Sequence, residues 1–302
     1  MLVSSAPRPR LEPPTVSELA STTARILGGL RIAAWRMGLA SSARDVSLPI
    51  LRGAFGAALH DLSSIAYEEV FRAEEQDAAP AYLLRRSGHR LPDRALFEMV
   101  LFERALPHLD VVLTAMQLAG ERGLGRDRRP FVVERLAWLD ALGRPAQALA
   151  REEAFALDRC SWPLAGNPAT TPCRLLFPEP VRILRKGVLQ EQLTLRDIAV
   201  AGFRRLGGLA QPEHRPLARA LQETGLDAAD GTASQTFVGS AGSVGRWSAT
   251  QQQFIELRGV TGHIDLPDGP GGLWRLLTAL QWIHCGKATV VGLGRLVVLP
   301  IW

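Results

Sequence analysis

The sequence predicts an α+β protein made of two tandem ferredoxin-like domains, each with a βαββαβ order of elements. In residues 24–160, segments of alternating hydrophobicity and segments of helical spacing follow one another in that order. Residues 161–302 repeat the order with one added helix, although no sequence repeat is visible. The chain has 302 residues, 47% hydrophobic and 22% charged, so it is long enough and apolar enough to bury two cores.

The first domain follows an N-terminal segment without periodicity. Residues 1–23 are rich in proline, serine and threonine, which predicts a flexible leader. The elements expected after it are a strand at 24–37, a helix at 49–71, a hairpin of 81–86 with 95–104, a helix at 107–125 and a strand at 129–143. The helix at 49–71 is expected to bury one face, formed by Ile50, Phe55, Leu59 and Leu62.

The second domain follows a segment rich in helix and strand breakers, residues 158–172, which predicts a domain boundary near residue 160. The elements expected after it are a strand or strand pair at 174–187, helices at 193–209 and 216–231, a hairpin of 243–259 with 260–269, a helix at 271–286 and a strand at 294–302. This order matches the first domain, apart from the helix at 216–231.

Composition excludes several classes of protein. The apolar stretch from Val290 to Trp302 is too short to cross a bilayer and contains Arg295. The proline-rich N-terminus lacks the apolar core of a signal peptide, so we expect a cytoplasmic protein without a membrane partner. Three cysteines without Cys-x-x-Cys spacing favour neither a disulfide framework nor a zinc site.

The cations are almost all arginine. Lysine and arginine together number 35 against 30 acidic residues, and Lys186 and Lys287 are the only lysines. The planar arginine side chain suits phosphate recognition and base stacking, although GC-rich coding also explains an arginine bias. Basicity therefore points only weakly to a nucleic-acid partner.

The most distinctive segment is CGKATVVGLGR, residues 285–295, in which three glycines surround two cations. Glycine allows a backbone to approach phosphate groups closely. A Walker loop would need a glycine at the position of Gln281, and a dinucleotide-binding loop follows a strand and opens a helix, whereas this loop follows a helix and opens a strand. The segment therefore predicts neither an ATP nor an NAD site.

The segment WIHCGKATVVGLGRLVV resembles the C-terminal signature of the CRISPR-associated precursor-RNA-processing endoribonucleases of the RAMP superfamily. That signature runs His, any residue, Gly, Lys, Gly, Thr, Thr, aromatic, Gly, Leu, Gly, Arg. Ala288 and Val291 depart from it, and the matching residues are His284, Gly286, Lys287, Thr289, Gly292, Leu293, Gly294 and Arg295. Weaker similarity, including LRGAFGAALHDL and VGRWSATQQQ, extends over most of residues 25–300.

The resemblance implies two ferredoxin-like domains, an RNA hairpin bound to a basic face, and cleavage that needs no metal or cofactor. In such cleavage the ribose 2′-hydroxyl attacks its own phosphate, so the site needs a proton acceptor, a proton donor and cations. Members of the family often use a histidine in or just after the first helix, where this chain has His60. The alternative for His60 is a solvent-facing histidine balanced by Asp61, in which case Arg52, Arg44 or Tyr67 could act instead.

The second histidine predicted to be catalytic is His284, which matches the terminal signature. The alternative favoured by its position is structural, because a histidine at the end of a helix can bond free carbonyls and interact with the helix dipole. The residues predicted to contact RNA are Arg52, Arg126, Arg128, Arg129, Arg246, Ser248, Gly286, Lys287, Gly292, Gly294 and Arg295. Many such charged segments are simply solvated loops.

These features predict a metal-independent endoribonuclease that binds the CRISPR repeat and cuts precursor crRNA, leaving a 2′,3′-cyclic phosphate. Its expected partners are the repeat RNA, the crRNA product and other subunits of a CRISPR effector complex. A non-catalytic RNA-binding RAMP subunit is the main alternative, since it would need the arginines but no histidine. A small-molecule enzyme ranks third, because ferredoxin-like domains carry many functions.

Overall fold

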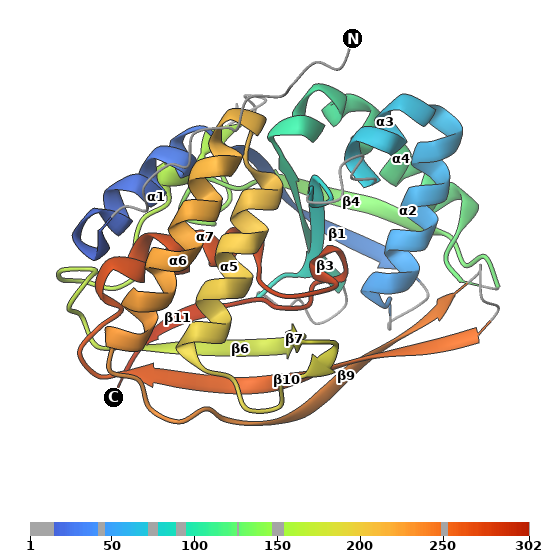
Figure 1. Ribbon diagram of the computed structural model, residues 1–302. Coiled ribbons are helices and arrows are strands. Elements are labelled where there is room, and N and C mark those ends of the chain that lie inside the picture. The colour runs from blue at the N-terminus through green and yellow to red at the C-terminus, as the bar shows by residue number, and fades with distance from the viewer. Residues whose placement is uncertain are drawn as a thin grey trace, which may run out of the picture.

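The computed structural model describes residues 15–41, 46–71, 78–88, 95–125, 127–146, 154–248 and 253–301. Helices and strands follow one another along the chain, and most of the strands form two antiparallel sheets (Figure 1). The α-helices are α1 (Leu19–Gly28), α2 (Leu48–Leu62), α3 (Ser64–Phe71), α4 (Leu109–Arg122), α5 (Leu195–Leu209), α6 (Arg215–Gly231) and α7 (Trp274–Ile283). The strands are β1 (Arg31–Ser41), β2 (Tyr82–Arg86), β3 (Ala95–Phe102), β4 (Phe131–Trp138), β5 (Phe155–Ala156), β6 (Cys173–Val181), β7 (Leu184–Arg185), β8 (Val188–Leu189), β9 (Val238–Ser248), β10 (Gln253–Leu266) and β11 (Val297–Pro300).

Both main sheets have the strand order of a ferredoxin-like domain. The first runs β2-β3-β1-β4, with β5 paired to the start of β1, and the second runs β11-β6-β10-β9. In each sheet the first and third strands of the βαββαβ order lie at the centre. The predicted tandem ferredoxin-like α+β fold is therefore confirmed. The predicted domain boundary near residue 160 remains a proposal.

The central strand of the first sheet, β1, is buried on both faces. Side chains of a strand alternate between faces, and on β1 Ile32 and Ala34 join one hydrophobic core while Trp35 and Met37 join another. The second of these cores lies under α2, α3 and α4, whereas the first continues into the C-terminal half through residues such as Phe177. The edge strand β4 is less covered, since its Val132 is exposed.

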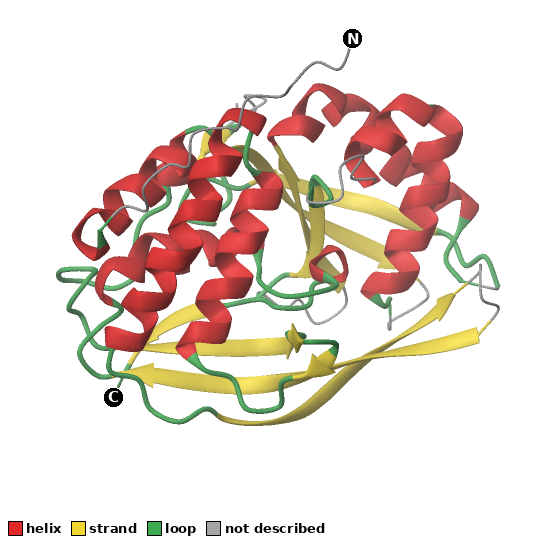
Figure 2. Cartoon of the chain, in the orientation of Figure 1, coloured by secondary structure: helices red, strands yellow, loops and turns green. Residues whose placement is uncertain are grey.

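The second sheet is covered by helices on one side only, as Figure 2 shows. On β6, Cys173, Leu175 and Phe177 are buried beneath the helices, while the residues between them are more exposed. The other side carries a two-pronged ion pair in which Arg174 donates to both carboxylate oxygens of Asp265, each at 2.7 Å.

The predicted leader is wrong over its last third, because Val16–Glu18 form a 3-10 turn that leads into α1. Leu19, Thr23, Ile26 and Leu27 recur at helical spacing and are buried. They pack α1 beside α6 and α7, which come from the other end of the chain (Figure 1). Residues 1–14 of the predicted leader lie outside the described part of the chain.

Two further predictions differ from the structure. The helix predicted at 49–71 is two helices, because Ser63 between α2 and α3 is extended, and Ile50 and Leu62 are exposed rather than buried. The turn predicted near Gly259 is wrong, because Gly259 lies within one continuous strand, β10, and pairs with Gly242 of β9. Its backbone lies so close to β6 that a Cβ would be 2.6 Å from the Val181 carbonyl oxygen. Within the described ranges, no helix has both the length and the apolar character needed to cross a membrane.

Candidate functional site

A cleft of about 710 Å³ lies where the two halves of the chain meet. Its walls come from the β7–β8 hairpin, one face of α5, residues 286–290 of the glycine-rich loop, and residues 78–80 that precede β2. We call this the basic cleft, because seven of its lining residues are cationic: Arg182, Arg185, Lys186, Arg196, Arg204, Arg205 and Lys287. Asp197 is the one acidic residue among the lining residues that the structure describes.

The β7–β8 hairpin positions Lys186 at the edge of the basic cleft. Leu184 pairs with Leu189 and Arg185 with Val188, which leaves a turn of two residues. Lys186 and Gly187 both have positive φ angles, 50° and 83°, the conformation of a type I′ turn. The tight turn fixes the direction of the backbone, and the Lys186 side chain is exposed.

Helix α5 supplies the longest wall. Its N-terminus is fixed by a capping box in which Thr194 accepts a hydrogen bond from the Asp197 amide while Asp197 accepts one from the Thr194 amide. The Asp197 carboxylate also pairs with Arg185 at 2.5 Å, joining the helix to β7. Residues four apart lie on one face of a helix, and the residues of this face that line the basic cleft are Arg196, Val200, Arg204 and Gly208.

Arg205 follows Arg204 on α5 and is buried in the wall of the basic cleft, with 7% of its surface exposed. Its Nε donates to the Ile283 carbonyl at 3.2 Å, and its guanidinium lies over the Phe102 ring at 5.6 Å from the centroid. Its Nη2 is buried and has no hydrogen-bond partner among the described residues. Burial lowers the pKa of Arg205 to about 10, so the group remains cationic at neutral pH.

The glycine-rich loop directs several of its amides toward the protein. The Lys287 amide donates to the Arg182 carbonyl at 2.8 Å and the Gly294 amide to the Pro180 carbonyl at 2.9 Å. The Gly292 amide donates to Thr289 within the loop. A Cβ on Gly286 would lie 2.5 Å from the Arg182 carbonyl oxygen. The positive φ angles of Gly286, Gly292 and Gly294 allow the loop to pack closely. Gly292 and Gly294 are buried, whereas Gly286 lines the basic cleft, and the RNA contacts predicted for these glycines remain a proposal.

The same loop also anchors the two halves of the chain to each other. Val291 and Leu293 are buried in the hydrophobic core of the first sheet. A Cβ on Gly292 would lie 2.6 Å from Leu48 of α2. The Lys287 side chain is exposed and lines the basic cleft, so its predicted contact with RNA remains a proposal.

His284 has no exposed surface, which contradicts the catalytic role predicted for it. Its Nδ1 lies 3.0 Å from the Leu293 carbonyl oxygen, and because a carbonyl only accepts, Nδ1 carries the proton. Burial, together with the charge of Arg85, holds the pKa of His284 well below its usual range. His284 is therefore a neutral structural residue that closes the loop.

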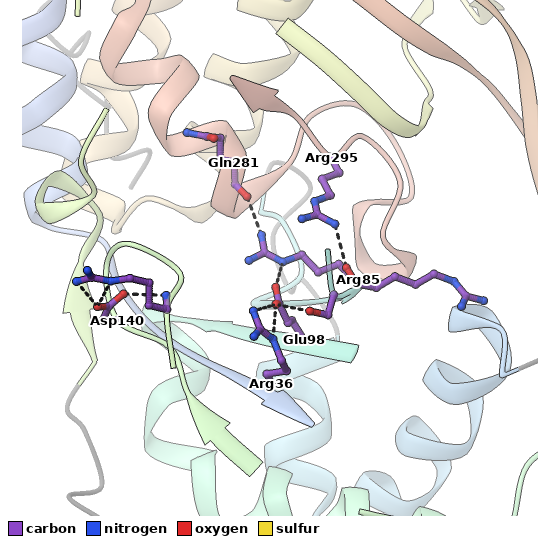
Figure 3. A network of polar contacts seen from close by, with 9 residues as sticks. Arg36, Arg85, Glu98, Asp140, Gln281 and Arg295 are labelled. Carbon is purple, nitrogen blue, oxygen red and sulfur yellow. Dashed lines mark hydrogen bonds and ion pairs between the residues drawn. The ribbon is translucent and has the colours of Figure 1, made fainter. Parts of the chain in front are cut away.

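Two arginines bond the free carbonyls at the end of α7, the role that the sequence suggested for His284. Arg85 donates to the Gln281 carbonyl at 2.7 Å, and Arg205 donates to that of Ile283. Figure 3 shows that Arg85 and Arg36 both donate to Glu98, which lies between them. Burial by itself raises the pKa of Glu98, but the charges of Arg85 and Arg36 outweigh it and hold the pKa below its ordinary value.

Arg295 lies beside this network and is partly buried. One of its terminal nitrogens donates to the Arg86 carbonyl at 3.0 Å, which joins the loop to the end of β2 (Figure 3). Burial and the nearby Arg85 lower the pKa of Arg295. Its observed contact is thus with protein, and its predicted contact with RNA remains a proposal.

His60 lies near the end of α2 on the surface, where its side chain is 60% exposed. Its Nδ1 is 3.6 Å from Asp61, which pairs with Arg122 of α4 at 2.5 Å, and its ring meets the edge of Tyr67. The loop contacts α2 at Leu48, twelve residues earlier, and a rise of 1.5 Å per residue places His60 about 18 Å along the helix from that contact. The structure does not bring His60 and Lys287 into one site.

The other predicted RNA-binding residues are dispersed. Arg52 is half-buried on α2, with its guanidinium over the Phe71 ring. Arg128 and Arg129 are exposed after α4, and Arg129 pairs with Asp127. The residues whose side chains lie outside the described part of the chain are Arg126, Arg246 and Ser248.

Most residues of the basic cleft are not marked by any motif in the sequence. Lys186, Arg204 and Arg205 were present in the sequence, but they come from segments that become neighbours only in the folded chain. The run of Arg204 and Arg205 after apolar residues at helical spacing was the one available signal, and such pairs are common on solvated helix faces.

Comparison with known proteins agrees with this architecture. A family model described as an N-terminal domain, AF_1859_N, matches residues 44–159, and no curated protein matches the sequence. A Cas6 product complex has a TM-score of 0.58 at 15% identity, and Thermus thermophilus Cas6 one of 0.53 at 15% identity; each match covers 89% of this chain and 99% of the other. A partial Cas6-RT-Cas1–Cas2 complex matches with a TM-score of 0.53 at 14% identity, over 89% of this chain and 46% of the other. The fold of this chain is that of the Cas6 proteins, which confirms at the level of fold the resemblance seen in the sequence.

Proposed function

We propose that the protein binds the repeat of a CRISPR precursor transcript and cuts it to release guide RNA. The observation that carries the proposal is the fold match to a Cas6 product complex over nearly the whole of both chains. The terminal sequence signature and the basic cleft, which share Lys287, also support it, because they place cations where a polyanion could bind.

The proposed chemistry is attack of the ribose 2′-hydroxyl on the adjacent phosphate, which leaves a 2′,3′-cyclic phosphate and a 5′-hydroxyl. His60 is the residue proposed to transfer a proton, because it is exposed and a histidine near neutral pH both accepts and donates protons. Arg122, which pairs with the Asp61 carboxylate next to His60, is the cation proposed to hold the phosphate.

The alternative is a non-catalytic RNA-binding subunit. His60 lies far along α2 from the glycine-rich loop and from the exposed Lys287 of that loop. This separation favours the alternative, since RNA cleavage needs the proton-transferring group and the phosphate-binding cations together. In either case the proposed partners are repeat RNA and other CRISPR proteins, and the match to a Cas6-RT-Cas1–Cas2 complex supports the second kind of partner.

One experiment separates the two functions. The purified protein is mixed with end-labelled repeat RNA in EDTA, and cleavage and binding are measured separately. Cleavage supports the endoribonuclease, whereas binding without cleavage supports the alternative.

His60→Ala is expected to lower the single-turnover cleavage rate by about 10²- to 10⁴-fold, the usual contribution of a general acid or base. The matched control is His108→Ala, which removes another histidine of the first half and should leave the rate unchanged. A His60→Ala variant that cuts at the wild-type rate would remove His60 from the mechanism.

A further inference from the structure

The strand β9 forms one edge of the second sheet. In the order β11-β6-β10-β9 it lies outermost, and Figure 1 shows it along the lower border of the molecule. It pairs with β10 in an unbroken register from Val238 to Ser248, without a bulge. Residues 238–241 and Ser243 are exposed. A strand with only one neighbour leaves alternate amides and carbonyls unpaired on its outer side, where another strand can bond to them.

The first part of β9 lacks the features that keep an edge strand from pairing. Residues 238–245 read VGSAGSVG and contain neither a charged residue nor a proline. Charged side chains, prolines, bulges and covering segments are the usual means by which proteins prevent contact between sheet edges. Val238, with 59% of its surface exposed, adds an apolar side chain next to this edge. The strand is therefore suited to accept a further strand.

The other edges of the two main sheets each have one of these features. The edge strand β11 has four residues and ends in Pro300. The edge strand β4 contains Glu134 and Arg135, and its pairing with β1 includes a register shift. The edge strand β2 is covered by the glycine-rich loop, because the 3-10 turn Thr289–Val291 packs against it. Among the described edges of these sheets, β9 is the one open to pairing.

We propose that β9 pairs with β9 of a second copy of this chain, in antiparallel orientation about a two-fold axis. Such pairing places residues 238–245 of one copy opposite the same segment of the other, and no like charges meet because the segment is uncharged. The product is one continuous antiparallel sheet in which each copy contributes four strands.

A second copy fits this edge better than a foreign peptide. Recognition of a peptide by strand addition takes its specificity from pockets for alternate side chains. Most of residues 238–245 are glycine, serine or alanine, which are too small to form the walls of such pockets. Pairing here rests on the backbone and on matching length, both of which a second β9 supplies. The inference does not depend on the proposed function.

Analytical ultracentrifugation of the wild type, with ribonuclease added, should show a dimer that dissociates on dilution. Ala241→Lys places a charge in the middle of the exposed segment and should raise the dimer dissociation constant at least about tenfold, because like charges then face each other across the two-fold axis. Ala241 is exposed, so the fold should persist, which thermal unfolding checks. The matched control is Val132→Lys, which adds the same charge to an exposed position of the edge strand β4 and should leave the constant unchanged.

Cross-linking locates the contact without depending on the lysine variant. The three cysteines of the chain are buried, so a cysteine introduced at the surface reacts selectively. On mild oxidation Ser240→Cys, Ala241→Cys and Ser243→Cys should form disulfide-linked dimers, with the position nearest the two-fold axis reacting fastest. Val132→Cys should remain a monomer under the same conditions.

A wild type that is monomeric at every concentration would overturn the inference. A dimer in which none of the β9 cysteines cross-links, or one that a folded Ala241→Lys variant retains at full strength, would do the same. An untreated dimer that ribonuclease converts to monomer would replace the strand contact by bridging RNA, and cross-linking of Val132→Cys alone would move the contact to β4.

Discussion

At the level of single residues, burial decides which side chains can do chemistry. His60 and His284 are the same residue type, and both occur in segments that resemble one family. The first is 60% exposed, whereas the second has no exposed surface and is held neutral. His284 also adopts φ 60° and ψ 174°, a conformation that is strained for any residue except glycine. Such strain persists only where the surrounding packing imposes it, which agrees with a structural role.

Glu98 gives a prediction about acid stability. It is 3% exposed and accepts hydrogen bonds from Arg36, Arg85 and Ser87. Because its pKa is lowered in the folded state, it stabilises the fold fully above its unfolded pKa of about 4.5, and this contribution is lost as pH falls from there through the lower folded pKa. Glu98→Gln should lower the free energy of unfolding at pH 7 by about 3 kcal/mol, since it leaves the buried Arg85 without its counter-ion.

The measurement is urea unfolding of the wild type and of Glu98→Gln between pH 7 and pH 3. The difference between the two proteins should shrink as the wild-type carboxylate becomes protonated. The matched control is Glu256→Gln, which removes an exposed carboxylate and should change stability by less than about 0.5 kcal/mol. A difference for Glu98→Gln that is the same at every pH would contradict the assignment.

At the level of elements, the glycine-rich loop is a structural connection that carries one exposed lysine. Its backbone bonds to the end of β6 and its apolar residues enter the core of the first sheet. Residues 286–290 line the basic cleft, and among them only Lys287 is exposed. The glycines of this signature thus allow the backbone of the loop to pack closely against neighbouring segments of the protein.

Gly294→Ala should destabilise the protein by at least about 3 kcal/mol. The new Cβ would lie 1.8 Å from the Cys285 carbonyl oxygen, and the φ angle of 71° is itself costly for alanine. The matched control is Gly231→Ala at the end of α6, where nothing lies within 4 Å and where stability should change by less than about 1 kcal/mol. Thermal unfolding of both variants checks the prediction, and equal melting temperatures would show that the loop can move.

At the level of the whole molecule, the two halves share one hydrophobic core. That core joins Ile32, Val100 and Phe102 of the first sheet to Leu175 and Phe177 of the second. Helix α1 adds a further connection, since it packs from the N-terminus onto the C-terminal helices. Two ferredoxin-like sheets in sequence therefore form one packed body.

This shared core predicts that the halves unfold together. Amide hydrogen exchange under mild denaturant should give the same opening free energy for the slowest amides of β3 and of β6. Phe102→Ala should lower both values equally, by about 3 kcal/mol, because it leaves a cavity in the common core. Separate opening free energies, or an effect of Phe102→Ala on β3 alone, would show that the halves unfold independently.

The element order follows from local sequence patterns. Alternation on β1, helical spacing on α5 and Gly123 at the end of α4 are each visible within a few residues, and the structure has each of them. The amphipathic pattern of α1 is equally local, but composition places residues 19–23 in a leader. The strand expected at 24–37 is wrong over residues 24–28, which are the end of α1, since β1 begins at Arg31. Fold and element types were therefore within reach of periodicity and turn chemistry.

The site was decided by tertiary structure. Arg85 reaches the end of α7 across 196 residues of sequence, and the basic cleft joins residues 78–80 to residues 286–290. The spacing of residues along a chain carries no information about such pairs, because loop closure brings distant segments together only when both have a buried face to share. The sequence determined which side chains were available for binding phosphate, and the packing of the two sheets determined which of them remained exposed, charged and close together.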